Sequence, residues 1–167
     1  MRSSDLPTLI EKYALKGVCP DTNIVLIAVI GLYDQRRIES FKRTQSKGYG
    51  VEDYRLIMRL LRRFSKRLTT PNILTEVDNL GRQLPENEHR GFSKAFTWFV
   101  DNYFEVHEPS IQTVRSPNYT SLGLTDAGLI SLSAGALILT DDFRLAGKIT
   151  GLMRDAINIH HLRGFSA

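Results

Sequence analysis

Helical and strand patterns alternate in the last third of the chain, and this order constrains the fold more than any other feature of the sequence. From about residue 110 onward we expect a helix over 126–133, a buried strand over 136–139, a helix over 142–153 and a last strand over 156–160. Helices that alternate with strands favour a parallel sheet with helices on both of its faces. The sequence therefore predicts an α/β fold.

Similar patterns occur in the first two thirds of the chain. The expected elements are a leading helix over 5–15, a strand over 16–19, an almost wholly apolar helix over 23–33, an amphipathic helix over 51–66, a strand over 67–70, a helix over 71–84, a long helix over 86–106 and a loop around Pro109 and Pro117. The stretch 23–33 on its own suits a strand as well as a helix. Thr70 and Pro71 are of the types that cap and begin a helix, and Thr125 is expected to cap the helix over 126–133.

The composition is that of an ordinary globular protein. The chain has 167 residues, of which 42% are hydrophobic and 24% are charged, and this size suits one domain around a single core. We expect one domain over 1–167, with residues 1–15 as an N-terminal extension. The longest apolar stretch, 24–32, is too short to span a bilayer, and the one cysteine, Cys19, fits a reducing compartment. With no signal peptide visible, these features predict a cytoplasmic protein that binds no membrane.

Four short acidic patches occur where the backbone is expected to turn from strand to helix or to start a helix. They are centred on Asp21 in Cys-Pro-Asp-Thr-Asn, Glu76 in Pro-Asn-Ile-Leu-Thr-Glu, Asp126 in Gly-Leu-Thr-Asp-Ala and Asp142 in Leu-Thr-Asp-Asp. Strand ends on one edge of an α/β sheet share a crevice. Carboxylates that meet there repel one another, by about 3 kcal/mol for two charges ~5 Å apart. Such a crevice takes up protons or binds a cation, and carboxylates suit Mg²⁺.

With these residues in place, the chain resembles the PIN domain family of nucleases over roughly Lys16 to Leu162. The matching stretches are Pro20-Asp21-Thr22-Asn23, Glu76 in its helix, Leu124-Thr125-Asp126-Ala127 and Thr140-Asp141-Asp142. The resemblance implies a three-layer α/β/α sandwich with a central parallel sheet. It also implies a metal-dependent endoribonuclease that cuts RNA, most often single-stranded RNA. Many small bacterial members are toxins held inactive by an antitoxin protein, and members often form homo-oligomers.

The resemblance further implies a role for each matching position. The expected catalytic residues, which are also the ligands of one or two Mg²⁺ or Mn²⁺ ions, are Asp21, Glu76, Asp126 and Asp142. Asn23 and Thr140 are expected to orient these acids. Because the fourth position is a doublet, either Asp141 or Asp142 is the ligand. Asp142 is favoured because it holds the third place of Thr-x-Asp, and Asp141 then supports the site. The chain is longer than the smallest toxins, with extra sequence between Asp34 and Arg67.

An acidic crevice can hold RNA only if cations lie beside it. The net charge of +4 and the isoelectric point near 9.3 allow a polyanionic partner. Arg144 and Lys148 lie one turn apart on the helix after Asp142 and are the expected contacts to backbone phosphates. The basic run from Arg59 to Arg67 is a second candidate, although it is also typical of the solvated face of an amphipathic helix. The four histidines lack the spacing of a metal site and are taken as structural.

Two other functions are open on this sequence. A non-catalytic PIN-like module that binds RNA or a protein would share the fold without cutting. An α/β phosphatase with Asp21 as nucleophile is disfavoured, because such enzymes place a second aspartate two residues on, where this chain has Asn23. The aromatic row from Phe92 to Phe104 is interpreted as core or as a dimer contact rather than as a surface on which bases stack.

Overall fold

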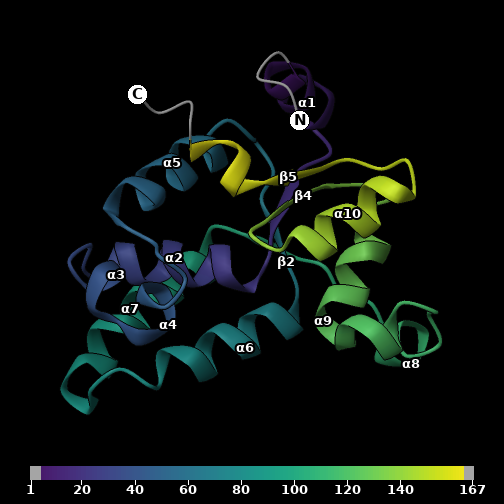
Figure 1. Ribbon diagram of the computed structural model, residues 1–167. Helices are drawn as coiled ribbons and strands as arrows, with labels where there is room; N and C mark the ends of the chain where they lie inside the picture. The colour runs from purple at the N-terminus through teal and green to yellow at the C-terminus, as the bar shows by residue number, and fades with distance from the viewer. Residues whose placement is uncertain (1–4, 164–167) are drawn as a thin grey trace.

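The computed structural model describes residues 5–163 and has a mixed α/β architecture (Figure 1). Its main sheet has the strand order β1-β4-β5, with β1 at Val18–Pro20, β4 at Leu137–Thr140 and β5 at Ala156–Asn158. A second pair joins β2 (Leu68–Thr69) to β3 (Phe104–Glu105). All of these pairings are parallel, so the predicted α/β class with parallel strands is confirmed.

A single parallel bridge connects the two sheets. Val18 pairs with Arg67, and the Val18 amide N donates a hydrogen bond of 3.1 Å to the carbonyl O of Lys66. The strands therefore follow one another in the order β3-β2-β1-β4-β5. At the carboxyl end of β1, the Asp21 amide N donates to the carbonyl O of Leu139 at 2.8 Å and extends the pairing with β4. The segments that follow β1 and β4 consequently emerge at the same edge of the sheet.

The described part of the chain is mostly helical (Figure 1). The α-helices are α1 (Asp5–Tyr13), α2 (Thr22–Tyr33), α3 (Arg37–Ser40), α4 (Lys42–Gln45), α5 (Val51–Leu61), α6 (Pro71–Gly81), α7 (His89–Asp101), α8 (Ser110–Thr113), α9 (Tyr119–Leu132) and α10 (Phe143–Gly151), and the 3-10 helices are η1 (Glu86–Glu88) and η2 (Ile159–His161). Among the described residues, none of these helices combines the length and the apolar character that crossing a membrane requires.

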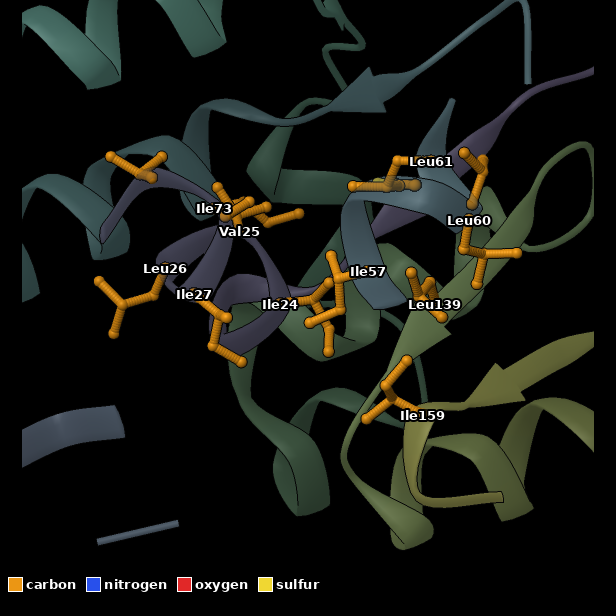
Figure 2. Close-up of a cluster of buried hydrophobic side chains, with 14 of the residues drawn as sticks. Ile24, Val25, Leu26, Ile27, Ile57, Leu60, Leu61, Ile73, Leu139 and Ile159 are labelled. Atoms are coloured by element: carbon orange, nitrogen blue, oxygen red, sulfur yellow. The ribbon is translucent and has the colours of Figure 1, made fainter. Parts of the chain in front are cut away.

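Helix α2 lies at the centre of the molecule and packs against α5, α6 and α7 (Figure 1). Its residues 24–31 are all buried, which explains why this stretch lacks the polar face of a surface helix. Figure 2 shows Ile24 and Ile27 of α2 in one apolar cluster with Ile57 of α5 and Leu139 of β4. Full burial of side chains of this size contributes about 1.5–3 kcal/mol each. The core therefore holds α2 firmly against the end of the sheet.

Helix α10 covers another part of the sheet, and helix α1 is tied to the residue that precedes β5. Helix α10 contacts β4, β5 and α9. Helix α1 is attached through Tyr13, which is buried and whose hydroxyl donates to Asp155 Oδ2 at 2.9 Å, and through Lys12 Nζ, which donates to the same oxygen at 2.6 Å. The segment expected as an N-terminal extension thus packs onto the core through Leu6, Leu9, Ile10 and Tyr13, while residues 1–4 lie outside the described range.

The long helix expected over 86–106 is wrong. The segment instead forms η1 and α7, which ends at Asp101, and then β3, in which Phe104 and Glu105 pair with β2. The Phe104 amide N donates to the carbonyl O of Arg67 at 2.8 Å. Pairing with a strand that is distant in the sequence overrides the local helical pattern here, as tertiary contacts often do.

The segment before Asp126 also differs from the expectation. The region read as a loop around Pro109 and Pro117 contains α8, and α9 begins at Tyr119 rather than at Asp126. A kink divides α9 at Gly123, whose φ of 82° and ψ of −179° lie outside the helical region and favour glycine. The kink places the residues after Gly123, including Asp126, on a helical segment of a different direction.

Candidate functional site

A cleft of about 310 Å³ opens at the carboxyl edge of β1 and β4, and the acids singled out in the sequence line it. Asp21 follows β1, Glu76 lies in α6, Asp126 lies in α9 and Asp142 follows β4. The other lining residues are Thr22, Asn23, Leu80, Leu122, Gly123, Leu124 and Thr125. The fold therefore brings together, on one cleft, four carboxyl groups that are widely separated in the sequence.

Asp21 is the most constrained of these acids. Its side chain is buried, with 4% of the residue exposed. Its Oδ1 accepts a hydrogen bond of 3.0 Å from the Ile24 amide N and thereby caps α2. Its Oδ2 accepts from the Thr140 hydroxyl and, at 3.3 Å, from the Asp141 amide N. These bonds fix the carboxyl group between β1, β4 and the start of α2.

Glu76 is exposed but is held by two threonine hydroxyls. Thr22 Oγ1 donates to Glu76 Oε2 at 2.7 Å, and Thr125 Oγ1 donates to Glu76 Oε1 at 2.5 Å. These bonds tie α6 to the start of α2 and to α9. The sequence predicts Thr125 as a helix cap. In the structure its hydroxyl donates to Glu76 instead.

Asp142 and Asp126 differ in how they are held. Asp142 is the N-cap of α10, and its Oδ1 accepts from the amide N atoms of Arg144 at 2.6 Å and Leu145 at 3.1 Å. Its own amide N donates to Thr140 Oγ1 at 2.9 Å. For Asp126, none of the described residues donates a hydrogen bond to the side chain. The carboxyl oxygens of Asp126 and Oδ2 of Asp142 therefore accept no hydrogen bond from the described residues.

The doublet Asp141-Asp142 separates into two roles. Asp142 lines the cleft, as the favoured reading of the doublet expects, whereas Asp141 is absent from the lining and has only 7% of its surface exposed. Asp141 Oδ1 accepts from Asn23 Nδ2 at 2.9 Å, and its Oδ2 accepts from Lys47 Nζ at 2.8 Å. Sequence analysis missed Lys47, which lies in the extra segment between Asp34 and Arg67. The one sequence signal for Lys47 is that it is a lysine in a polar loop, and this does not identify its partner.

The cleft acids have perturbed acidities. Burial raises the pKa of Asp21 to about 7, and the nearby charge of Asp141 adds to the rise, although hydrogen bonds from Thr140 and from backbone amides oppose it. Burial likewise raises the pKa of Asp126 to about 6, and repulsion from Asp142 and Glu76 acts in the same direction. A group of carboxyl groups that resists ionisation in this way is stabilised by a bound cation.

The predicted phosphate contacts lie at the rim of the cleft. The exposed Arg144 donates through Nη2 to the carbonyl O of Ser121 at 2.6 Å, and Lys148 Nζ donates to Ser121 Oγ at 3.3 Å. Ser121 immediately precedes the lining residue Leu122, so both cations are close to the cleft. In the basic run, Arg59 lies on α5, whereas Arg62, Arg63 and Lys66 follow the end of that helix at Leu61. All four side chains are exposed.

The donor set of the cleft fits a hard divalent cation in its chemistry. Carboxylates and hydroxyls supply oxygen, which Mg²⁺ and Mn²⁺ prefer, and the described lining includes neither histidine nor cysteine. Asp126 and Asp142 retain free oxygen lone pairs. Within residues 5–163, however, no group of three or more acidic, histidine or cysteine side chains is placed so that it could hold a metal ion. The acids share a cleft without converging on one point.

Comparison of the chain with protein-family models, with curated protein sequences and with solved structures gives no match in any of the three.

Proposed function

We propose that this protein is a Mg²⁺- or Mn²⁺-dependent endoribonuclease of the PIN class, with the three-layer α/β/α fold of that family and a cytoplasmic location. One observation carries the proposal: Asp21, Glu76, Asp126 and Asp142, from four separate parts of the chain, line a single cleft. The parallel strand order and the position of the cleft at the carboxyl ends of β1 and β4 agree with a ligand site of an α/β sheet.

Each acid of the cleft would have a distinct role in holding the metal ion. A divalent ion held by carboxylates activates water for attack on phosphorus and stabilises the leaving oxygen. Asp126 and Asp142 would offer free lone pairs to that ion, and Asp21 would join them in an orientation set by Thr140 and the backbone. Glu76 would close the cleft from α6, positioned by Thr22 and Thr125. Asn23 acts indirectly, through Asp141.

A single-stranded RNA substrate is consistent with the charges around the cleft. Arg144 and Lys148 stand beside acids that repel a polyanion. Contacts from such cations to phosphates give salt-dependent binding with little sequence preference. The proposed partners are therefore RNA and, if the protein is a toxin, an antitoxin protein; homo-oligomerisation is a further expectation of the PIN assignment.

Incubation of the protein with a labelled single-stranded RNA in Mn²⁺ or in EDTA tests the proposal. We expect cleavage in Mn²⁺ that EDTA abolishes and that Asp21→Asn and Asp126→Asn each reduce by more than about 100-fold. Asp101→Asn is the matched control, because Asp101 is an exposed aspartate at the end of α7. Cleavage that persists in EDTA, or that is reduced as strongly by Asp101→Asn, would overturn the proposal.

A non-catalytic PIN-like module is the second candidate, and one observation favours it. The described acids form no group of three that could hold a metal ion. Both carboxylate oxygens of Glu76 already accept hydrogen bonds from threonine hydroxyls. Such a module would bind the labelled RNA equally in Mn²⁺ and in EDTA and leave it intact. The same incubation, analysed by gel for both bound and cut RNA, separates the two functions.

A toxin role would appear in living cells. If the protein is a toxin, its expression without an antitoxin should stop growth, and Asp126→Asn should relieve the arrest at the same level of expression. Equal growth of the wild-type and Asp126→Asn strains would exclude this role and leave the nuclease chemistry to be judged by the incubation with RNA.

A further inference from the structure

An exposed aromatic ring lies at the start of α10, next in sequence to an acid of the cleft. Phe143 follows Asp142 in the chain and is the first residue of α10, yet 60% of its surface is exposed. Its ring stacks on His160, with the two centroids 5.4 Å apart and the planes inclined by 12°, and it meets the edge of His161 at 5.7 Å. A large apolar ring at a helix start gains little from folding while it stays in water.

The stack continues behind Phe143 and is anchored in the protein. His160 stacks in turn on the buried ring of Tyr49, with centroids 6.4 Å apart and an angle of 15° between the planes. The guanidinium of Arg163 lies 5.1 Å from the centre of the Tyr49 ring and is ion-paired to Asp53 at 2.8 Å. The row of nearly parallel rings is therefore supported from within, and Phe143 is its exposed end.

A cavity of about 520 Å³ lies next to this exposed ring. Phe143, Gly147 and Thr150 of α10 form one wall, and His161 and Asn158 form another. Its volume is in the range of pockets that bind small organic groups. The small residues on α10 leave the space beside the ring open.

A buried hydrogen-bond donor in the wall of this cavity has no partner. Asn158 has 2% of its surface exposed, and its Oδ1 accepts from the His160 amide N at 3.0 Å. Its Nδ2 makes no hydrogen bond to any described residue. A buried donor left unpaired costs free energy that an acceptor on a ligand would recover. The cavity is thus lined by a flat apolar ring and by a residue whose buried amide donor is unpaired.

We propose that this cavity binds an unpaired nucleobase of the RNA, stacked on Phe143 with its acceptor edge toward Asn158. The inference rests on the proposed RNA substrate and names the part of it that is recognised. A nucleobase has the flat π-face and the edge acceptors that the two side chains require. Asp142 lines the acidic cleft and the next residue, Phe143, lines the cavity, so the two sites are linked along the chain at the start of α10.

The unpaired amide of Asn158 favours an occupant with hydrogen-bond acceptors over a purely apolar one. An apolar peptide would leave the Asn158 amide unpaired, whereas a base satisfies it. Duplex RNA, whose bases are already stacked and paired, cannot present a base to this site.

Fluorescence anisotropy of a short labelled single-stranded RNA of mixed sequence, titrated with protein in EDTA, tests this site separately from cleavage. We expect Phe143→Ala to weaken binding by about tenfold, since loss of one base–aromatic stack has an effect of that order. Phe143→Trp should retain binding because it keeps a stacking ring. Phe104→Ala is the matched control, because Phe104 is also an aromatic residue with 61% exposure but lies in β3 at the far side of the sheet. The same RNA annealed to its complement should bind without dependence on Phe143.

Each outcome decides the question. Equal binding by the wild type and Phe143→Ala, an equal loss in Phe104→Ala, or no binding of the RNA by the wild type would overturn the nucleobase site. Cleavage in Mn²⁺ is measured on separate samples, so the two proposals fail separately. Phe143-dependent binding without Mn²⁺-dependent cleavage would support the nucleobase site and contradict the nuclease. Mn²⁺-dependent cleavage together with binding that does not depend on Phe143 would support the nuclease and contradict the nucleobase site. A thermal melt of each variant shows that it is folded.

Discussion

The ammonium group of Lys47 lies 2.8 Å from Oδ2 of Asp141 and joins the loop between α4 and α5 to the end of β4. The Asp141 side chain is 4% exposed, whereas that of Lys47 is 43% exposed. Burial by itself raises the pKa of Asp141, but the hydrogen bonds from Lys47 and Asn23 outweigh burial and hold this pKa below its usual range. The pair keeps Asp141 charged next to the protonation-prone Asp21.

Lys47→Met should therefore destabilise the protein. The change leaves a buried carboxylate without its cation, and we expect the free energy of unfolding to fall by about 1–2 kcal/mol, a value reduced because Lys47 is half-exposed. Urea unfolding at neutral pH measures it. Lys94→Met is the control, because Lys94 is an exposed lysine of α7. Equal stability of Lys47→Met and the control would contradict the role given to the pair.

Thr140 joins two of the cleft acids and should be sensitive to loss of its hydroxyl. Its side chain is fully buried, donates to Asp21 Oδ2 and accepts from the Asp142 amide N. Thr140→Val keeps the shape but removes the acceptor of the Asp142 amide N and leaves Asp21 Oδ2 with only the bond from the Asp141 amide N. It should lower the free energy of unfolding by about 1–3 kcal/mol and raise the pKa of Asp21 further. Thr140→Ser keeps the hydroxyl and should retain most of the stability. Denaturant unfolding of the two variants compares them, and a valine variant as stable as the serine variant would refute the expectation.

The stability of the metal-free protein should fall as the pH rises from about 4 to about 7. The pKa values of Asp21 and Asp126 are raised in the folded state, to about 7 and about 6, so over this range the folded protein binds more protons than the unfolded chain. The free energy of unfolding then decreases with pH. Asp126→Asn, which cannot ionise, should lose less stability than the wild type over the same range in EDTA, and Asp101→Asn should behave as the wild type. Parallel pH dependences for the wild type and Asp126→Asn would contradict the perturbed acidity.

Close packing between α6 and α7 makes Gly81 intolerant of a larger residue. A Cβ built on Gly81 would lie 1.9 Å from Cζ of Phe92, a ring that is fully buried. Gly81→Ala should cost about 1–3 kcal/mol of stability through overpacking. Gly128→Ala in α9 is the control, because its Cβ would meet nothing within 4 Å, and it should stabilise the helix by up to about 1 kcal/mol. Thermal denaturation distinguishes these opposite signs, and stabilisation by Gly81→Ala would disprove the packing argument.

Long elements with a clear period were predictable from the sequence, and short elements were not. The amphipathic helix α5 follows from its apolar spacing, and α6 follows from Thr70, whose Oγ1 accepts from the Ile73 amide N at 3.3 Å. The apolar stretch of α2 suited a strand as well as a helix, because full burial leaves it no polar face. The strand β3 has two exposed residues that continue a helical pattern, and only its partner β2 makes it a strand. The kink at Gly123 depends on a single φ angle, which no local pattern reveals.

That Asp21 and Asp142 share an edge was predictable, because they follow the parallel strands β1 and β4. Glu76 and Asp126 lie inside α6 and α9, so the strand-end argument does not place them. The division of the Asp141-Asp142 doublet was settled only by the partners of Asp141, since Asn23 and Lys47 come from segments distant in the sequence. The stacking of Phe143 on His160 was equally hidden, because it joins the start of α10 to η2. The sequence interpretation treated the histidines as structural, and His160 packs against the Phe143 ring.

The most direct test of the central claim is an anomalous difference map from crystals soaked in Mn²⁺, collected at a wavelength where manganese scatters anomalously. The account predicts a peak in the cleft with oxygen atoms of Asp21, Asp126 and Asp142 as its nearest protein neighbours. A map without a peak in the cleft at high Mn²⁺ concentration, or with ordered peaks only elsewhere on the surface, would contradict the assignment of the cleft as a metal-dependent site.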